Sequence, residues 1–88
     1  MPVLSIFFGI IVRIWHDDHP PPHIQVEHQG FEALVEIQTG HVSKGKLLRK
    51  VAAIVQEWCR THQQELLDNW KRAQHFEPLE HMQGVDHD

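Results

Sequence analysis

The chain is poor in the residue types on which several common kinds of site depend. Its one cysteine, Cys59, cannot form an internal disulfide, which fits a protein of the reducing cytosol. The sequence has no Cys-x2-Cys pair for zinc, no glycine-rich phosphate loop and no Ser-His-Asp arrangement that local spacing supports. Histidines and acidic side chains are therefore the residues in which to look for chemistry.

Long apolar runs are also missing. The stretch Val3–Trp15 is apolar, but it is shorter than the roughly 20 residues of a membrane span and it contains Arg13. It has neither a basic leader nor a small-residue cleavage site, so it does not resemble a signal peptide. We therefore expect a soluble, cytoplasmic protein with no membrane partner.

Positive charge is scarce, because 8 Lys and Arg residues stand against 12 Asp and Glu and give a formal net charge of −4. A protein of this charge is not expected to coat nucleic acid without specificity. Seven of the eight basic residues nevertheless lie between Lys44 and Arg72. This clustering predicts a local basic face on an acidic protein.

Three segments in the first half have the pattern of β-strands. Val3–Trp15 is almost continuously apolar and rich in β-branched and aromatic residues, as in a strand covered on most of both faces. His23–His28 alternates between apolar and polar residues, and Phe31–Ile37 is its return strand. Gln29-Gly30 between them is typical of a tight hairpin turn. The pattern predicts a three-stranded antiparallel sheet in meander order.

The second half has the 3.6-residue period of helices. After a loop punctuated by Thr39-Gly40 and Lys44-Gly45, the period changes at Lys46. An apolar stripe then follows, which consists of Leu47, Val51, Ile54, Val55 and Trp58. Thr61 and Gln64 match a capping box, which predicts a break near Thr61 and a second helix to about Gln74.

These elements predict an α+β fold in which both C-terminal helices pack on one face of the sheet. Residues 1–75 form a single domain, and residues 76–88 are expected to be a flexible tail because they are polar and contain Pro78 and Gly84. Trp15, Trp58 and Trp70 are interpreted as core and helix-packing residues, since no interleaved platform of exposed aromatic residues is evident.

The loop His16–His23 carries the densest group of histidines and acids. Three prolines, Pro20–Pro22, stiffen it. His23 and His19 are side chains of the type that titrates near neutral pH, so they can accept and donate the protons that ribonucleotide cleavage needs. Glu27 has the same strand parity as His23 and would orient it or share in the proton transfer.

The same loop supplies nitrogen and oxygen ligands for a divalent metal such as zinc. The candidate ligands are His16, His19, His23 and Asp18. The spacing His-x2-His-x3-His is not a recognised zinc signature, however, and the prolines restrict how the loop can fold around an ion. A third interpretation is structural, in which the carboxylates cap the turn and the histidines bridge the loop to the sheet.

A basic cluster surrounds the start of the first predicted helix. Lys46, Arg49 and Lys50 share a face at helical spacing, and Lys44 lies close by in the sequence. Helix N-termini attract phosphate, and added basic side chains strengthen that attraction. The cluster predicts a phosphate or nucleic-acid contact, and the alternative is a solvated face that compensates the acidic strands.

Several short motifs together resemble one family. They are the opening Met1–Ile10, Asp17-Asp18-His19, Pro21-Pro22-His23, Val26-Glu27, Thr39-Gly40 and Glu65–Trp70. In these residues the chain resembles the small bacterial proteins of domain-of-unknown-function family 4160, from Met1 to about Pro78. The resemblance implies a small stand-alone protein of a kind often encoded beside another short protein, in an arrangement similar to toxin–antitoxin pairs.

The layout of three strands with a strand-borne histidine also resembles small messenger-RNA-cleaving toxins of the HicA type, although the order of elements differs and the analogy is one of fold. The sequence departs from the family at Gln25, where relatives commonly have a second histidine. Glutamine cannot titrate and is a poor metal ligand. His28 stands where an aromatic residue is usual, so it does not replace the missing histidine.

Two functions follow from these patterns. The first is a toxin–antitoxin-type component that acts on or binds RNA, with His23 and His19 as acid and base. In that function Lys46, Arg49 and Lys50 contact phosphates. The second is a non-enzymatic binding module whose His/Asp loop holds a divalent metal or a protein partner. In either function, the apolar first strand and small core predict pairing with a second copy or with a small protein partner encoded nearby.

Overall fold

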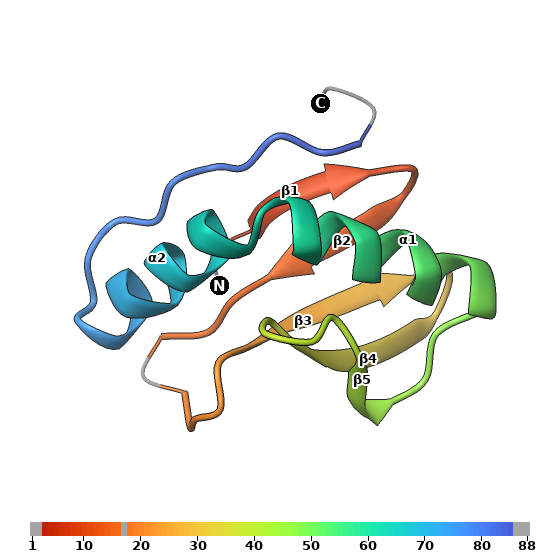
Figure 1. The fold of residues 1–88 in the computed structure, drawn as a ribbon, viewed down its shortest axis with the longest axis horizontal. Coiled ribbons are helices and arrows are strands. Elements are labelled where there is room, and N and C mark those ends of the chain that lie inside the picture. The colour runs from red at the N-terminus through yellow and green to blue at the C-terminus, as the bar shows by residue number, and fades with distance from the viewer. Residues whose placement is uncertain (1–2, 17, 86–88) are drawn as a thin grey trace.

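A computed structural model of the chain describes residues 3–16 and 18–85. It consists of one five-stranded sheet with two helices across one face (Figure 1). The strands are β1 (Val3–Phe7), β2 (Ile10–Arg13), β3 (His23–His28), β4 (Phe31–Glu36) and β5 (Val42–Gly45), and the helices are α1 (Arg49–Thr61) and α2 (Gln63–Gln74). Each strand pairs antiparallel with its neighbours in sequence. The predicted α+β meander followed by two helices is confirmed, whereas the predicted number of three strands is wrong.

One additional strand arises because the apolar stretch Val3–Trp15 turns back on itself. Phe8 and Gly9 have φ angles of 52° and 72°. Two successive left-handed residues close a short hairpin with the twist that a sheet requires. The turn places Phe7 opposite Ile10, and both side chains are buried. Because the residues on both sides of the turn are apolar, the hydrophobic pattern does not reveal it.

The other additional strand, β5, falls in the segment predicted as a loop. It pairs with β4, where Lys44 stands opposite Leu34, and every residue of β5 is exposed. Gly45 at its end has φ of 82°, and a Cβ at this position would lie 2.4 Å from the carbonyl oxygen of Glu32. A strand with no buried face shows no alternation of apolar residues, which is why the sequence pattern missed it.

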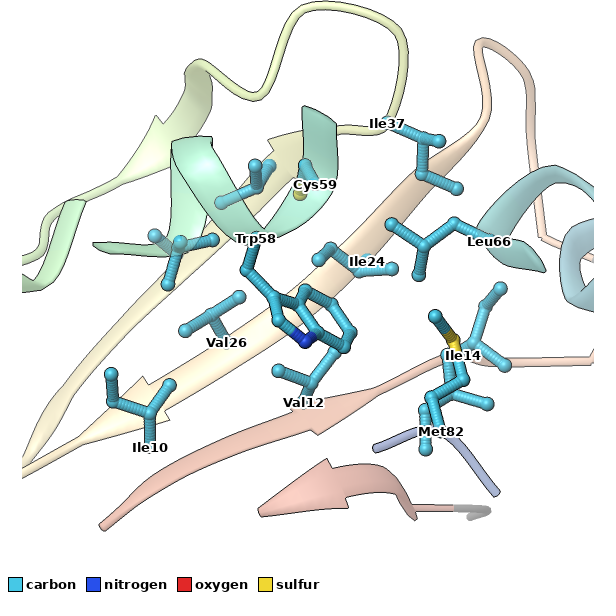
Figure 2. Packing of buried hydrophobic residues seen from close by; sticks show 14 of the residues in the cluster. Ile10, Val12, Ile14, Ile24, Val26, Ile37, Trp58, Cys59, Leu66 and Met82 are labelled. Atoms are coloured by element: carbon cyan, nitrogen blue, oxygen red, sulfur yellow. The ribbon is translucent and has the colours of Figure 1, made fainter. Parts of the chain in front are cut away.

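Helix α1 places its predicted stripe against the sheet. Val51, Val55 and Trp58 are buried, and Figure 2 shows the Trp58 indole in the middle of the apolar cluster between helix and sheet. The helix begins at Arg49 and not near Lys46 as predicted, because the Lys46 N–H bonds to the carbonyl oxygen of Glu32 at the end of the sheet. Within the described part of the chain, no helix has the length and apolar character needed to cross a membrane.

The break between the helices lies at His62, one residue after the predicted position. The predicted capping box does not form, because the Thr61 hydroxyl donates to the carbonyl oxygen of Glu57 instead. Helix α2 ends at Gln74 as predicted and buries Leu66 and Trp70.

The segment after α2 lies beside β1 (Figure 1). The Met82 N–H donates to the carbonyl oxygen of Leu4, 2.7 Å away, and the Met82 side chain is only 1% exposed. The flexibility expected for residues 76–88 stays a prediction, and residues 86–88 lie outside the described residues. The contacts show where this segment packs when it is docked.

Candidate functional site

The loop between β2 and β3 is held by its one described aspartate. One carboxylate oxygen of Asp18 accepts the N–H of His19 at 2.8 Å, and the other lies 2.9 Å from Nε2 of His23. The Gln74 side chain on α2 donates to the carbonyl oxygen of Asp18 at 2.9 Å, which ties the loop to the helical layer. The peptide bond between Pro20 and Pro21 is cis. Asp17 lies outside the described residues.

His23, the first residue of β3, has acceptors at both ring nitrogens. Nδ1 lies 2.9 Å from the carbonyl oxygen of Pro21, and Nε2 faces the Asp18 carboxylate. A carbonyl oxygen only accepts, so Nδ1 carries a proton; an ionised carboxylate likewise requires a proton on Nε2. The doubly protonated ring therefore makes both bonds at once, as does a neutral ring beside a protonated Asp18. In this arrangement neither nitrogen is free for a metal or a substrate.

The His23 ring is also packed from the helical side. Its centroid lies 5.2 Å from that of Trp70 on α2, and the side chain is 13% exposed. These contacts match the structural interpretation of the loop, in which a histidine bridges loop and sheet. His23 is thus fixed by the carboxylate, by the proline loop and by α2.

A hollow of about 540 Å³ opens beside this loop. It is lined by Trp15, Asp18, His19, Pro20, Pro21, His23, Gln25, Leu34, Glu36, Ser43 and Lys44. His19 is exposed, and no hydrogen bond to its ring is found among the described residues. The hollow therefore brings together the two candidate acid/base histidines and one member of the basic cluster, Lys44, which enters on β5.

Trp15 is a residue of this site that the sequence analysis assigned wrongly to the core. It is 41% exposed, and its indole nitrogen donates to the side-chain oxygen of Gln25 at 2.6 Å. The Gln25 amide nitrogen in turn donates to Glu32 at 3.2 Å. Gln25 thus orients an aromatic ring at the rim of the hollow.

The third candidate for acid/base chemistry, Glu27, lies apart from the histidines. Its carboxylate pairs with the guanidinium of Arg13 on the neighbouring strand, and it does not line the hollow. Strand parity placed it correctly on the same face as His23, but four positions along β3 separate the two side chains. Glu27 therefore pairs with Arg13 and does not orient His23.

The four candidate metal ligands do not form a cluster. His16 stacks on Phe76, with ring centroids 5.8 Å apart, while His23 is engaged with Asp18. Among residues 3–16 and 18–85, no three His, Cys, Asp or Glu side chains are placed to hold a metal ion. No part of the described geometry therefore favours the metal interpretation.

The basic residues lie between the end of β5 and the first turn of α1. Lys46, Arg49 and Lys50 are exposed, and over the described ranges none is within ion-pair distance of a carboxylate. The first turn of α1 contains no acidic residue, and Leu48 at its N-cap makes no side-chain hydrogen bond. Positive charge and uncapped N–H groups therefore coincide at this helix end.

Cys59 takes no part in the site. Its thiol is fully buried in the core, and burial raises the pKa of this group from 9.0 to about 12. A thiol with so high a pKa is almost entirely protonated at neutral pH and is therefore a poor nucleophile.

The fold and the hollow define a small α+β domain whose His/Asp loop and β5 border one open site. Residues 9–71 match the profile of the family described as Domain of unknown function (DUF4160), and the chain belongs to this family. No curated protein and no solved structure gives a significant match to the chain.

Proposed function

We propose that this protein is a cytoplasmic, bacterial component of toxin–antitoxin type that binds single-stranded RNA in the hollow beside the His/Asp loop. The observation that carries the proposal is the meeting of an exposed indole, an exposed histidine and an exposed lysine at that hollow, in Trp15, His19 and Lys44.

Each of these groups suits a different part of a nucleotide. Single-stranded nucleic acids bind by stacking bases on aromatic side chains and by placing phosphates against basic ones. Trp15 offers the ring and Lys44 the charge. Lys46 follows closely in sequence and leads to the uncapped start of α1, so the backbone of a longer RNA would find further positive charge there.

Acidic side chains limit where the phosphates can lie. Glu36 and Asp18 also line the hollow. Carboxylates repel phosphates but accept hydrogen bonds from exocyclic amino groups of bases. We therefore expect bases to occupy the part of the hollow near Glu36 and phosphates to occupy the part near Lys44.

Binding is favoured over cleavage by the state of His23. Acid/base catalysis by His19 and His23 together would require the His23 ring to leave either Pro21 or Asp18, since both of its nitrogens are engaged. His19 has no such restriction. RNA binding therefore needs no rearrangement of the loop, whereas cleavage does.

The test is the fluorescence anisotropy of a labelled single-stranded RNA, titrated with wild-type protein and with Trp15→Ala and Lys44→Ala. Lys71→Ala is the matched control, because Lys71 is exposed on α2 and does not line the hollow. Loss of one phosphate contact should weaken binding and lower the slope of log K against log salt by about 0.7 in Lys44→Ala. Trp15→Ala should cost about five- to 150-fold in affinity, the range of one base stack.

Equal RNA affinity in Lys44→Ala, Trp15→Ala and Lys71→Ala would overturn the proposal. Cleavage has a separate readout, which is the integrity of total RNA and the growth of a bacterial host after induced expression. If the wild type degrades RNA and His19→Ala or His23→Ala does not, the site is catalytic as well as binding.

A further inference from the structure

The segment Leu79–Val85, here called the C-terminal segment, is an extended chain seated in a groove. The groove is defined here by the groups that contact the segment, which lie on the outer edge of β1, on α1 and on α2. Figure 1 shows the segment running beside β1. The Met82 N–H donates to Leu4 on that edge at 2.7 Å. An extended chain that bonds to the edge of a sheet is one of the standard modes of peptide recognition.

The helices hold the segment by its backbone. The Asn69 side chain donates to the carbonyl oxygen of Glu80 at 3.1 Å and accepts the N–H of the same residue at 2.9 Å. The indole nitrogen of Trp58 donates to the carbonyl oxygen of Gln83 at 3.1 Å. Because the segment takes part in these contacts through its peptide groups alone, a segment of another sequence could make the same contacts.

Two side chains of the segment add selectivity. Met82 is buried in the main core, and Figure 2 shows it reaching the cluster that contains Ile14 and Leu66. The Glu80 carboxylate lies 3.4 Å from the guanidinium of Arg72. The groove therefore favours an acidic residue followed two positions later by an apolar side chain that is not branched at Cβ.

Beyond Gln83 the groove continues into an apolar hollow of about 360 Å³. The hollow is lined by Ile54, Glu57, Trp58, Thr61, His62 and Val85. Val85 remains 48% exposed at its mouth. Within the described part of the segment, Met82 is thus completely buried, whereas Val85 fills its hollow poorly.

We propose that this groove is a binding site for an extended segment of a partner protein, and that the chain's own C-terminal segment occupies it in cis. The preferred partner sequence has an acidic residue, a Met or Leu two positions later and a bulky apolar residue three positions after that. The proposal goes beyond RNA binding and does not depend on it.

The described part of the cis segment, which ends at Val85, leaves room in the hollow beside Trp58 for a larger partner side chain. The short connection through Phe76 and Pro78 gives the cis segment a high effective concentration, which a partner must overcome. A larger side chain in the hollow beside Trp58 supplies the additional burial. One extra methylene should strengthen binding about fourfold.

The test uses labelled peptides with the sequence of residues 77–85, titrated by fluorescence anisotropy against the full chain carrying Met82→Ala, in which the cis anchor is weakened. A peptide with Val85→Leu should bind about fourfold tighter than the native sequence. A peptide with Met82→Asp should not bind. The wild-type full chain should bind the native and Val85→Leu peptides more weakly, because its own segment competes.

Two substitutions in the full chain locate the peptide. Trp58→Phe removes the donor to Gln83 together with part of a buried ring, and should weaken binding by at least about two- to tenfold. Trp70→Phe is the matched control, because the Trp70 ring lies against His23, and it should leave the affinity unchanged. RNA binding by Trp58→Phe should equal that of the wild type, which separates this proposal from the RNA proposal.

Failure of the peptides to bind the folded Met82→Ala chain, or equal affinity of the Val85→Leu and Met82→Asp peptides, would overturn the proposal. If circular dichroism shows that the Met82→Ala chain is unfolded, the wild-type chain is used instead. In that case excess Val85→Leu peptide must shift the Met82 methyl signal in NMR spectra, and an unchanged signal would overturn the proposal.

Discussion

Replacing Met82 by alanine tests whether the C-terminal segment is part of the folded domain. The side chain is 1% exposed and belongs to the cluster that joins helices and sheet. Truncation of a buried methionine to alanine typically costs about 2–5 kcal/mol, through lost burial and the remaining cavity. The decrease in the free energy of unfolding has an upper limit, because the variant cannot lose more than the free energy with which the segment docks.

The measurement is urea denaturation followed by tryptophan fluorescence, with His81→Ala as the control. His81 is the preceding residue and is exposed, so its truncation should change the free energy of unfolding by less than about 0.5 kcal/mol. We expect Met82→Ala to lower it by at least about 2 kcal/mol. If the segment of Met82→Ala is already undocked before the rest of the chain unfolds, less surface becomes exposed in the main transition. The dependence of the free energy of unfolding on urea concentration should then be smaller than in the wild type.

If Met82→Ala and His81→Ala are both neutral, the reasoning is refuted. The segment would then spend most of its time undocked, and the flexible tail predicted from its polar sequence would describe the protein in solution. The peptide groove would then lack its cis occupant.

Three further predictions concern the core and the sheet edge. Burial raises the pKa of Cys59 to about 12, so on raising the pH the unfolded chain loses its thiol proton before the folded chain does. The free energy of unfolding should therefore fall above pH 9 by up to about 1.4 kcal/mol per pH unit. Denaturation of Cys59→Ala between pH 8 and 10.5 should lack this slope, and equal slopes for the two proteins would contradict the assignment. Gly45→Ala should lower the free energy of unfolding by at least about 2 kcal/mol, because its Cβ would lie 2.4 Å from Glu32. Gly30→Ala is the control, because Gly30 also has a positive φ but nothing lies within 4 Å, and it should cost about 1 kcal/mol. Similar melting temperatures of the two variants would contradict the clash. Ser5→Ala should raise the free energy of unfolding by about 1 kcal/mol, because the Ser5 hydroxyl is buried with no hydrogen-bond partner among the described residues, and a destabilised variant would show that the hydroxyl is paired.

The sequence predicted those parts of the fold in which one face of an element is buried. His23–His28 and α1 were recognised because their apolar residues follow the period of a strand or a helix. The turn at Phe8-Gly9 was missed because apolar residues continue through it, and β5 because it has no buried face. Periodicity follows burial only where the exposed positions are polar. It therefore fails in β1 and its turn, where Ile6 and Phe8 are apolar but 45% and 52% exposed, so the expectation of a strand covered on most of both faces is wrong there. It also fails in β5, where no residue is buried.

The candidate site was predicted in part for a similar reason. His19 and His23 were chosen by residue type, and the structure places both at one hollow. The role of Trp15 could not be read from the sequence, because it depends on a hydrogen bond from the loop after β2 to Gln25 on β3. The pairing of Glu27 with Arg13 likewise follows from the register of β2 and β3, which local spacing does not contain.

The meander also determines the order in which the chain can assemble. Every strand pairs with the next one in sequence, so the loops that close are short and the sheet can form progressively during synthesis. The bond between Leu4 and Met82 is the exception, because it joins segments near opposite ends of the described chain. A nascent chain on the ribosome would therefore carry a folded sheet with an empty groove along β1 until residues 79–85 emerge. During that interval another polypeptide can reach the groove without competition.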